Sequence, residues 1–120
     1  MNTNSISIIL KFNDALNKHD VDGMMRLMTA DCVFENTSPP PYGERFEGQA
    51  AVRAFWTAFF LGSQTCSIEP EEVFAFEDRV VMRWIYRWVG LDGALGQVRG
   101  IDLYRLKGDL IAEKHSYVKG

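Results

Sequence analysis

One carboxylate, Asp102, lies among side chains that favour a chemical role for it. Segment 97–106 alternates as a β-strand does, so Gly100 and Tyr104 share the face of Asp102. Segment 79–89 alternates as well and presents a face of Val, Met, Trp and Tyr. A carboxyl group among apolar rings loses hydration and tends to stay protonated, and a neutral acid can donate a hydrogen bond to a ligand oxygen. The alternative is a buried aspartate that accepts from nearby donors and only shapes the core.

Other polar side chains are candidates for contacts beside Asp102. His115 could act as a base near neutral pH, although a single histidine in a strand more often has a structural or interfacial role. Asn36 could contact a ligand or could cap the loop that follows it. Four arginines on the strand face opposite Asp102 could bind an anion, but ion pairs across strands or between subunits are favoured. They are Arg83, Arg87, Arg99 and Arg105.

Several familiar kinds of site have no motif in this sequence. No CxxC, HExxH, GxGxxG or GxxxxGK[ST] pattern occurs, which argues against zinc, dinucleotide and P-loop sites. We therefore expect no cofactor and no metal. The two cysteines, Cys32 and Cys66, are expected to stay reduced and partly buried rather than to form a redox site.

The first half of the chain is predicted to be mostly helical. Apolar residues recur at helical spacing from Ile6 to Leu16, with Asn4 and Ser5 as candidate caps. Asp20 is the expected N-cap of a short second helix. A third helix carries several aromatic residues on one face and is expected to end at Gly62. Those aromatic residues are Phe55, Trp56, Phe59 and Phe60.

Strand signals begin in the first half and dominate the second. A short strand is predicted at 32–36, and a rigid loop at 37–45, where three consecutive prolines remove backbone donors. Four strands are predicted from Thr65 onward, and the clearest are 79–89, 97–106 and 110–118. Helices followed by a meander of long strands predict an α+β fold in a single domain, residues 1–120.

Charge and composition limit the classes of partner and the location expected for the chain. The net charge of −3 makes nucleic acid and anionic membrane surfaces poor partners. No apolar run approaches the ~20 residues of a membrane span. The segment Met1–Leu10 lacks the features of a signal peptide, so we expect a cytoplasmic protein. Aromatic residues make up 12 % of the chain, more than a small core needs, so they are expected to fill a dense core, line a cavity or form an interface.

Three stretches carry a family resemblance: FNDALNKHDVDGMMRLMTADCVFEN at 12–36, GERFEGQAAVRAFW at 43–56 and RGIDLYRLKGDLIAEKHSYVKG at 99–120. The chain resembles the SnoaL-like and ketosteroid-isomerase-like branch of the nuclear-transport-factor-2-like superfamily. The resemblance implies a cone-shaped fold, in which three helices pack on a strongly curved mixed or antiparallel sheet that encloses one apolar pocket. It also implies a homodimer through the outer sheet face, and the half-apolar outer face of 79–89 favours the same arrangement. The superfold hosts many unrelated activities.

By this resemblance, the chain retains one of the three site residues of ketosteroid isomerases. The position of their catalytic base, an aspartate, corresponds to Asn36, whose amide cannot take a proton from carbon. The position of their oxyanion-hole tyrosine corresponds to Phe12, which has no hydroxyl. Their second oxyanion-hole group corresponds to Asp102. The resemblance therefore implies the scaffold more strongly than the steroid isomerisation.

Two other groups of relatives give less definite correspondences. The aspartate that cyclase relatives use in the last strand corresponds to Ser116 or to His115, because a one-residue shift in the 107–110 turn exchanges the two faces. Epoxide-hydrolase relatives need an arginine and two aspartates around a water, and that set has no match where 79–89 reads Trp84-Ile85-Tyr86.

These observations lead to two hypotheses. In the first, an enzyme without a cofactor, of the isomerase or lyase type, acts on a small apolar molecule that bears a carbonyl or hydroxyl group. Asp102 donates to or polarises that oxygen, and His115 or a water relays the proton. In the second, the chain is a non-catalytic ligand-binding or dimeric interaction module. The expected ligand-binding residues are Phe12, Phe34, Asn36, Phe55, Met82, Trp84, Tyr86, Trp88, Tyr104 and Ser116.

Overall fold

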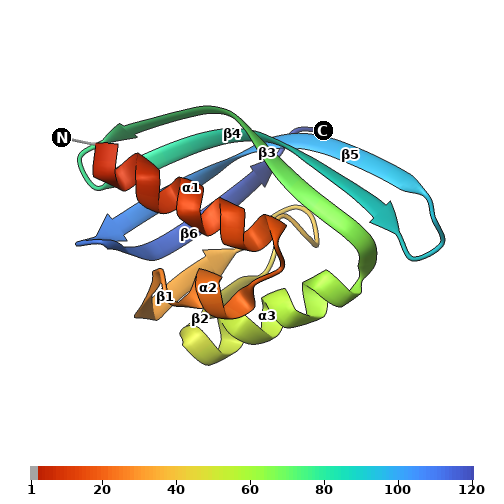
Figure 1. Cartoon of the computed structure of the whole chain (residues 1–120), viewed down its shortest axis with the longest axis horizontal. Helices are drawn as coiled ribbons and strands as arrows, with labels where there is room; N and C mark the ends of the chain where they lie inside the picture. Colours follow the sequence, from red (N-terminus) through yellow and green to blue (C-terminus); the bar gives the residue numbers. More distant parts are fainter. Residues whose placement is uncertain (1–2) are drawn as a thin grey trace.

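Three stretches with helical spacing form the helices, as the sequence predicts. The computed structural model describes residues 3–120, and its helices are α1 (Thr3–Asn17), α2 (Val21–Met25) and α3 (Gln49–Leu61) (Figure 1). Asp20 caps α2, because its Oδ1 accepts a hydrogen bond from the amide of Gly23 at 3.0 Å. Gly62 ends α3. None of these described helices is long and apolar enough to cross a membrane.

The start of α1 differs from the prediction. The helix already includes Thr3, so Asn4 and Ser5 lie within its first turn and are not its caps. The amide Nδ2 of Asn4 instead donates to Oδ1 of Asp109 at 2.9 Å. This long-range contact joins the first turn of α1 to the turn between the last two strands, a use of the side chain that local spacing does not reveal.

Six strands form one sheet with mixed pairing. Their bounds are β1 (Met28–Glu35), β2 (Arg45–Glu47), β3 (Ser63–Phe76), β4 (Arg79–Gly90), β5 (Leu95–Lys107) and β6 (Leu110–Val118). The order across the sheet is β2-β1-β6-β5-β4-β3, with β1 parallel to β6 and the other neighbours antiparallel. The last three strands lie where the alternation predicts them.

The strands near the prolines are predicted less well. Strand β1 begins at Met28, earlier than the predicted segment 32–36, and its pairing with β6 is irregular between Met28 and Val33. That irregularity breaks the alternation on which the prediction depends. Strand β2 begins at the last residue of the predicted loop 37–45, and its three residues are too few to show a period.

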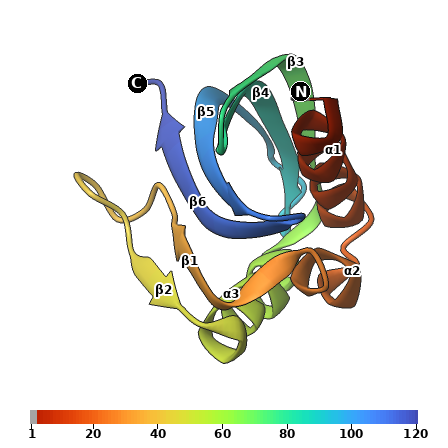
Figure 2. The same ribbon diagram turned by 90° about the vertical axis from the view of Figure 1, so that its left-hand side faces the viewer.

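The sheet is strongly curved and does not close, and the helices pack against it (Figure 2). Two glycines of β5 let large rings lie directly on the backbone. A β-carbon at Gly100 would collide with the ring of Trp84 and with the carbonyl of Tyr117, and one at Gly96 would collide with the ring of Trp88. These contacts bring the aromatic face of β4 close to β5.

Candidate functional site

A cavity of about 380 Å³ lies between α3, the loop that follows β1, and strands β4 to β6. Six aromatic residues line it, and the loop contributes Asn36, Thr37, Ser38 and Pro39. The rings come from β1 (Phe34), α3 (Phe55, Trp56, Phe59) and β4 (Trp84, Tyr86). Asp102, Lys114 and Ser116 are the polar strand residues of the lining. The cavity therefore combines an apolar wall with a small polar region, as ligand sites commonly do.

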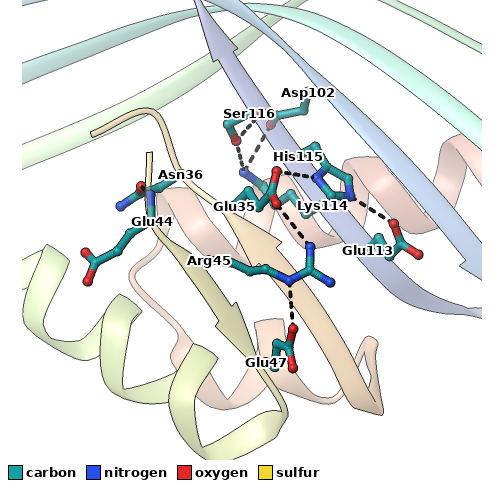
Figure 3. Close-up of polar contacts among 10 residues, drawn as sticks. All are labelled: Glu35, Asn36, Glu44, Arg45, Glu47, Asp102, Glu113, Lys114, His115 and Ser116. Atoms are coloured by element: carbon teal, nitrogen blue, oxygen red, sulfur yellow. Dashed lines mark hydrogen bonds and ion pairs between the residues drawn. The ribbon is translucent and has the colours of Figure 1, made fainter. Parts of the chain in front are cut away.

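The polar region is one connected cluster (Figure 3). Lys114 Nζ donates to Ser116 Oγ at 3.0 Å, and Ser116 Oγ donates to Asp102 Oδ1 at 2.6 Å. The other carboxylate oxygen, Asp102 Oδ2, lies 3.2 Å from Lys114 Nζ and accepts from the hydroxyl of Tyr104 at 3.2 Å. The side chains of Lys114 and Asp102 are only 3 % and 1 % exposed. A buried ion pair is thus bridged by one hydroxyl.

These contacts change the chemistry expected of Asp102. The sequence left open whether Asp102 is a neutral acid that donates to a ligand or a buried aspartate that accepts from nearby donors, and the structure gives its two oxygens three donors: Tyr104, Ser116 and Lys114. Accepting from all three is the behaviour of an ionised carboxylate. The Ser116 hydroxyl already donates its one hydrogen to Asp102, so the donor that this cluster can offer to a ligand oxygen is the Lys114 ammonium.

Aromatic rings complete the surroundings of Lys114. Its Nζ lies 4.7 Å from the ring centroid of Phe34, 5.4 Å from that of Trp56 and 5.9 Å from that of Tyr104. Rings at these distances attract a cation through their negative faces. The ammonium is therefore held by oxygen atoms and ring faces in a region with little water.

Lys114 is not among the site residues predicted from the sequence, although the sequence of β6 carries a signal for it. In β6 the residues Ala112, Lys114 and Ser116 alternate with Ile111, Glu113 and His115. A lysine between alanine and serine on one strand face is consistent with an inward-facing charge, but only the register of β6 shows which face is inward. Without that register, Lys114 looked like an ordinary surface residue.

A bulge fixes that register. Arg105 pairs with Glu113 and Leu106 pairs with Ile111, so Ala112 is an extra residue on β6. Beyond the bulge, Asp102 is directly opposite Ser116 and Leu103 is opposite His115. Ser116 therefore lies on the cavity face of the sheet and His115 on the other face, which settles the ambiguity that the sequence left open.

His115 belongs to an ion-pair network on the outer face (Figure 3). Its Nδ1 lies 3.0 Å from Glu35 Oε1 and its Nε2 lies 2.8 Å from Glu113 Oε1. Hydrogen bonds from His115, and then from Arg45, hold the pKa of Glu35 below its usual value, and His115 with Arg105 has the same effect on the pKa of Glu113. The structure does not bring His115 together with Asp102 in the cavity.

Asn36 mainly organises the proline loop. Its Oδ1 accepts from the amide of Ser38 at 3.3 Å and from the amide of Glu44 at 2.8 Å. This is the capping role that the sequence analysis gave as the alternative to ligand contact. The residue still lines the cavity, and the loop forms part of the cavity rim.

Four residues predicted to contact ligand lie outside this cavity lining. Phe12 and Met82 are fully buried in the core, and Tyr104 lies in contact with Asp102 and with the ring of Phe12. Burial and the nearby Asp102 charge hold the pKa of the Tyr104 phenol well above its usual value. Trp88 lies further along β4, stacked on Tyr86. Strand alternation identified the inward face but not which part of it borders the cavity.

The four arginines make ion pairs on the outer sheet face. Arg83 pairs with Glu71 and Glu72, and Arg87 pairs with Glu69. Arg99 likewise pairs with Glu71, and Arg105 with Glu113. The favoured interpretation of these residues as partners in ion pairs is confirmed within the chain. Across residues 3–120, no group of three or more His, Cys, Asp or Glu is placed to hold a metal ion.

A family model described as a SnoaL-like domain matches residues 9–114. The chain belongs to the SnoaL-like family. This match covers most of the chain and includes Asp102 and Lys114. The family resemblance drawn from the sequence is thereby confirmed. No curated protein matches the chain significantly.

Solved structures of similar proteins confirm the fold. An NTF2-like protein of unknown function from Mesorhizobium loti is 35 % identical, with a TM-score of 0.80 over 98 % of this chain and 92 % of the other. A putative SnoaL-like polyketide cyclase from Jannaschia sp. CCS1 is 19 % identical, with a TM-score of 0.83 over 98 % and 86 %. A protein with a ketosteroid-isomerase-like fold from Catenulispora acidiphila, in complex with trimethylamine, is 14 % identical, with a TM-score of 0.83 over 92 % and 83 %.

Proposed function

We propose that this SnoaL-like protein binds a small, mostly apolar molecule through a carbonyl or hydroxyl oxygen and catalyses proton transfer on it. The observation that carries the proposal is the buried Lys114–Ser116–Asp102 cluster in an aromatic cavity. Burying two charges costs free energy, and apolar residues of similar size often give equal or greater stability. A charged cluster at the wall of a cavity is therefore better explained by a ligand than by packing.

Each member of the cluster has a distinct role in the proposed reaction. Lys114 stabilises negative charge that develops on the ligand oxygen, because a fixed cation acts strongly in a site with little water. Ser116 accepts the proton that leaves the ligand carbon while it passes its own proton to Asp102, 2.6 Å away. Asp102 is thus the final acceptor, and the product of this step is an enolate paired with Lys114.

This step is shared by several reactions of the isomerase and lyase type. An enolate can be reprotonated at another carbon, can expel a leaving group or can attack a second carbonyl. The structure from Jannaschia is named a putative polyketide cyclase, and cyclisation by an enolate is one of the reactions that the proposal includes. Asn36 contributes no base, so the proposed base is Asp102 acting through Ser116.

Deuterium exchange tests the proposal without the natural substrate. The protein is incubated in D₂O with 2-tetralone, a small ketone with exchangeable hydrogens next to its carbonyl, and incorporation is followed by proton NMR. We expect the protein to accelerate the exchange, and Lys114→Met and Asp102→Asn each to lower the protein-dependent rate by about 100-fold or more. His115→Gln is the matched control and keeps the wild-type rate. Equal rates in all four proteins would refute the assigned roles.

Non-catalytic binding is the second candidate. It is favoured by Asn36, which stands where ketosteroid isomerases have their base and whose Oδ1 is engaged by the loop backbone. In that case the protein binds the ketone but leaves its exchange rate unchanged. Titration calorimetry with 2-tetralone, carried out beside the exchange measurement, separates binding from conversion.

We also propose that two copies pair through the outer sheet face. Phe74, Ile101 and Tyr117 are between 38 % and 55 % exposed on that face. Ile101 pairs across the strands with Tyr117 and with Arg83, so the apolar side chains lie beside charged ones. Arginines and glutamates are interspersed there, and a face carrying both charges can complement a second copy of itself.

A further inference from the structure

A second hollow lies beside the cavity, at the end of α3. Its volume is about 300 Å³, and it is lined by Ala58, Phe59, Gly62, Ser63, Tyr86 and Trp88. Figure 1 shows the region, where α3 leads into β3 and the β4–β5 hairpin extends past the helix. Phe59 and Tyr86 line both this hollow and the main cavity, so the two spaces share a wall.

The shared wall is aromatic and uncharged. The ring centroids of Phe59 and Tyr86 are 6.0 Å apart, and Tyr86 stacks on Trp88 at 5.0 Å. Burial, with the nearby Cys66, raises the pKa of the Tyr86 phenol, which therefore stays neutral over the physiological range. The rings form a continuous apolar surface that leads from the main cavity to Trp88.

We infer that the two spaces hold one elongated ligand, whose oxygen lies at the Lys114 cluster and whose apolar part extends across Phe59 and Tyr86 to Trp88. The inference rests on the proposed function and adds a class of ligand to it: molecules with one oxygenated end and a long hydrocarbon part. The polar cluster fixes the oxygenated end, because Lys114 uses two of its three N–H donors on Ser116 and Asp102 and has one left for a ligand oxygen. The path from the cluster across Phe59 and Tyr86 to Trp88 is mainly aromatic, so affinity grows with the apolar area that the ligand buries.

Calorimetric titration with 4-ethyl-, 4-butyl-, 4-hexyl- and 4-octylphenol, below their aggregation concentrations, tests this inference. The phenol hydroxyl represents the oxygenated end, and the chain measures how far the apolar path continues. We expect affinity to keep rising up to the octyl compound, by about fourfold for each fully buried methylene.

Two tryptophan substitutions on α3 make the test specific to the second hollow. Ala58 lines the hollow and is exposed, so Ala58→Trp fills the hollow without entering the main cavity. Ala54 is an exposed alanine one turn earlier that lines neither space, and Ala54→Trp is the matched control. We expect Ala58→Trp to bind 4-ethylphenol as the wild type does but to lose the gain from longer chains. Ala54→Trp is expected to keep that gain.

The outcomes separate this inference from the proposed function. If 4-ethylphenol binds the wild type but longer chains do not increase the affinity, the inference of an elongated ligand is refuted. The main cavity then remains the proposed ligand site. The same conclusion follows if Ala58→Trp keeps the full chain-length gain. If no member of the series binds, the proposed ligand site fails, and the present inference fails with it.

Discussion

Lys114 and Asp102 are the residues on which the interpretation of this site depends most. Their charges are almost fully buried, and each is matched by the other and by Ser116. The rings of Phe34 and Trp56 add favourable contacts to the ammonium. The two buried charges compensate each other only when both residues are present, since removing one leaves an uncompensated charge in an apolar region.

A stability measurement tests this balance. Lys114→Met keeps most of the side-chain volume but leaves Asp102 buried without its cation, so we expect the free energy of unfolding to fall by about 3 kcal/mol. Adding Asp102→Asn removes the isolated charge and is expected to recover much of that loss. Urea denaturation gives both values.

The control for that measurement is Lys107→Met, at an exposed lysine in the same strand as Asp102. We expect its effect on the free energy of unfolding to stay within about 0.5 kcal/mol. Equal losses in the single and the double variant would show that Lys114 and Asp102 do not interact as the geometry indicates.

At the scale of the elements, the long ones could be predicted from the sequence. Alternation over many residues in β4 and β5, and helical spacing in α1 and α3, are local signals that tertiary packing then reinforces. These signals placed Asp102 on an inward face beside the aromatic face of β4, and the structure agrees. The three-residue β2 and the irregular start of β1 carry no such period.

The register of β6 could not be predicted from the sequence. For that reason Lys114 was absent from the predicted site and the choice between Ser116 and His115 stayed open. The bulge at Ala112 exchanges the faces of every later residue, so the sequence could not decide between Ser116 and His115 and did not point to Lys114. Of the aromatic residues of α3, only Phe55 was expected to contact a ligand, yet Trp56 and Phe59 line the cavity as well. Helical spacing shows that a ring is turned inward but not whether it meets another side chain or a cavity.

At the scale of the whole molecule, the curved sheet separates two surfaces with different uses. Its concave side, with α1 and α3, forms the core and the cavity, whereas the outer side carries the ion pairs of four arginines and of His115. Exposed apolar residues lie between those charges, and the proposed second copy would remove them from water.

Light scattering in the micromolar range tests the dimer. We expect the wild-type chain to have twice the mass of a single copy, and Ile101→Glu to reduce the mass to that of one copy, because it replaces an apolar side chain of the contact by a charged one. Leu61→Glu is the matched control, since Leu61 is 75 % exposed at the end of α3, away from the outer face. A wild-type chain with the mass of one copy would contradict the proposed pairing.

The central claim is that the Lys114–Ser116–Asp102 cluster receives a ligand oxygen inside the aromatic cavity. The most direct measurement is a crystal structure of the protein in complex with 4-ethylphenol. The account predicts the phenol oxygen within hydrogen-bonding distance of Lys114 Nζ or Ser116 Oγ, with the ring against Trp56 and Trp84. A phenol bound only outside the cavity, with the three residues contacting one another as they do without it, would contradict the claim.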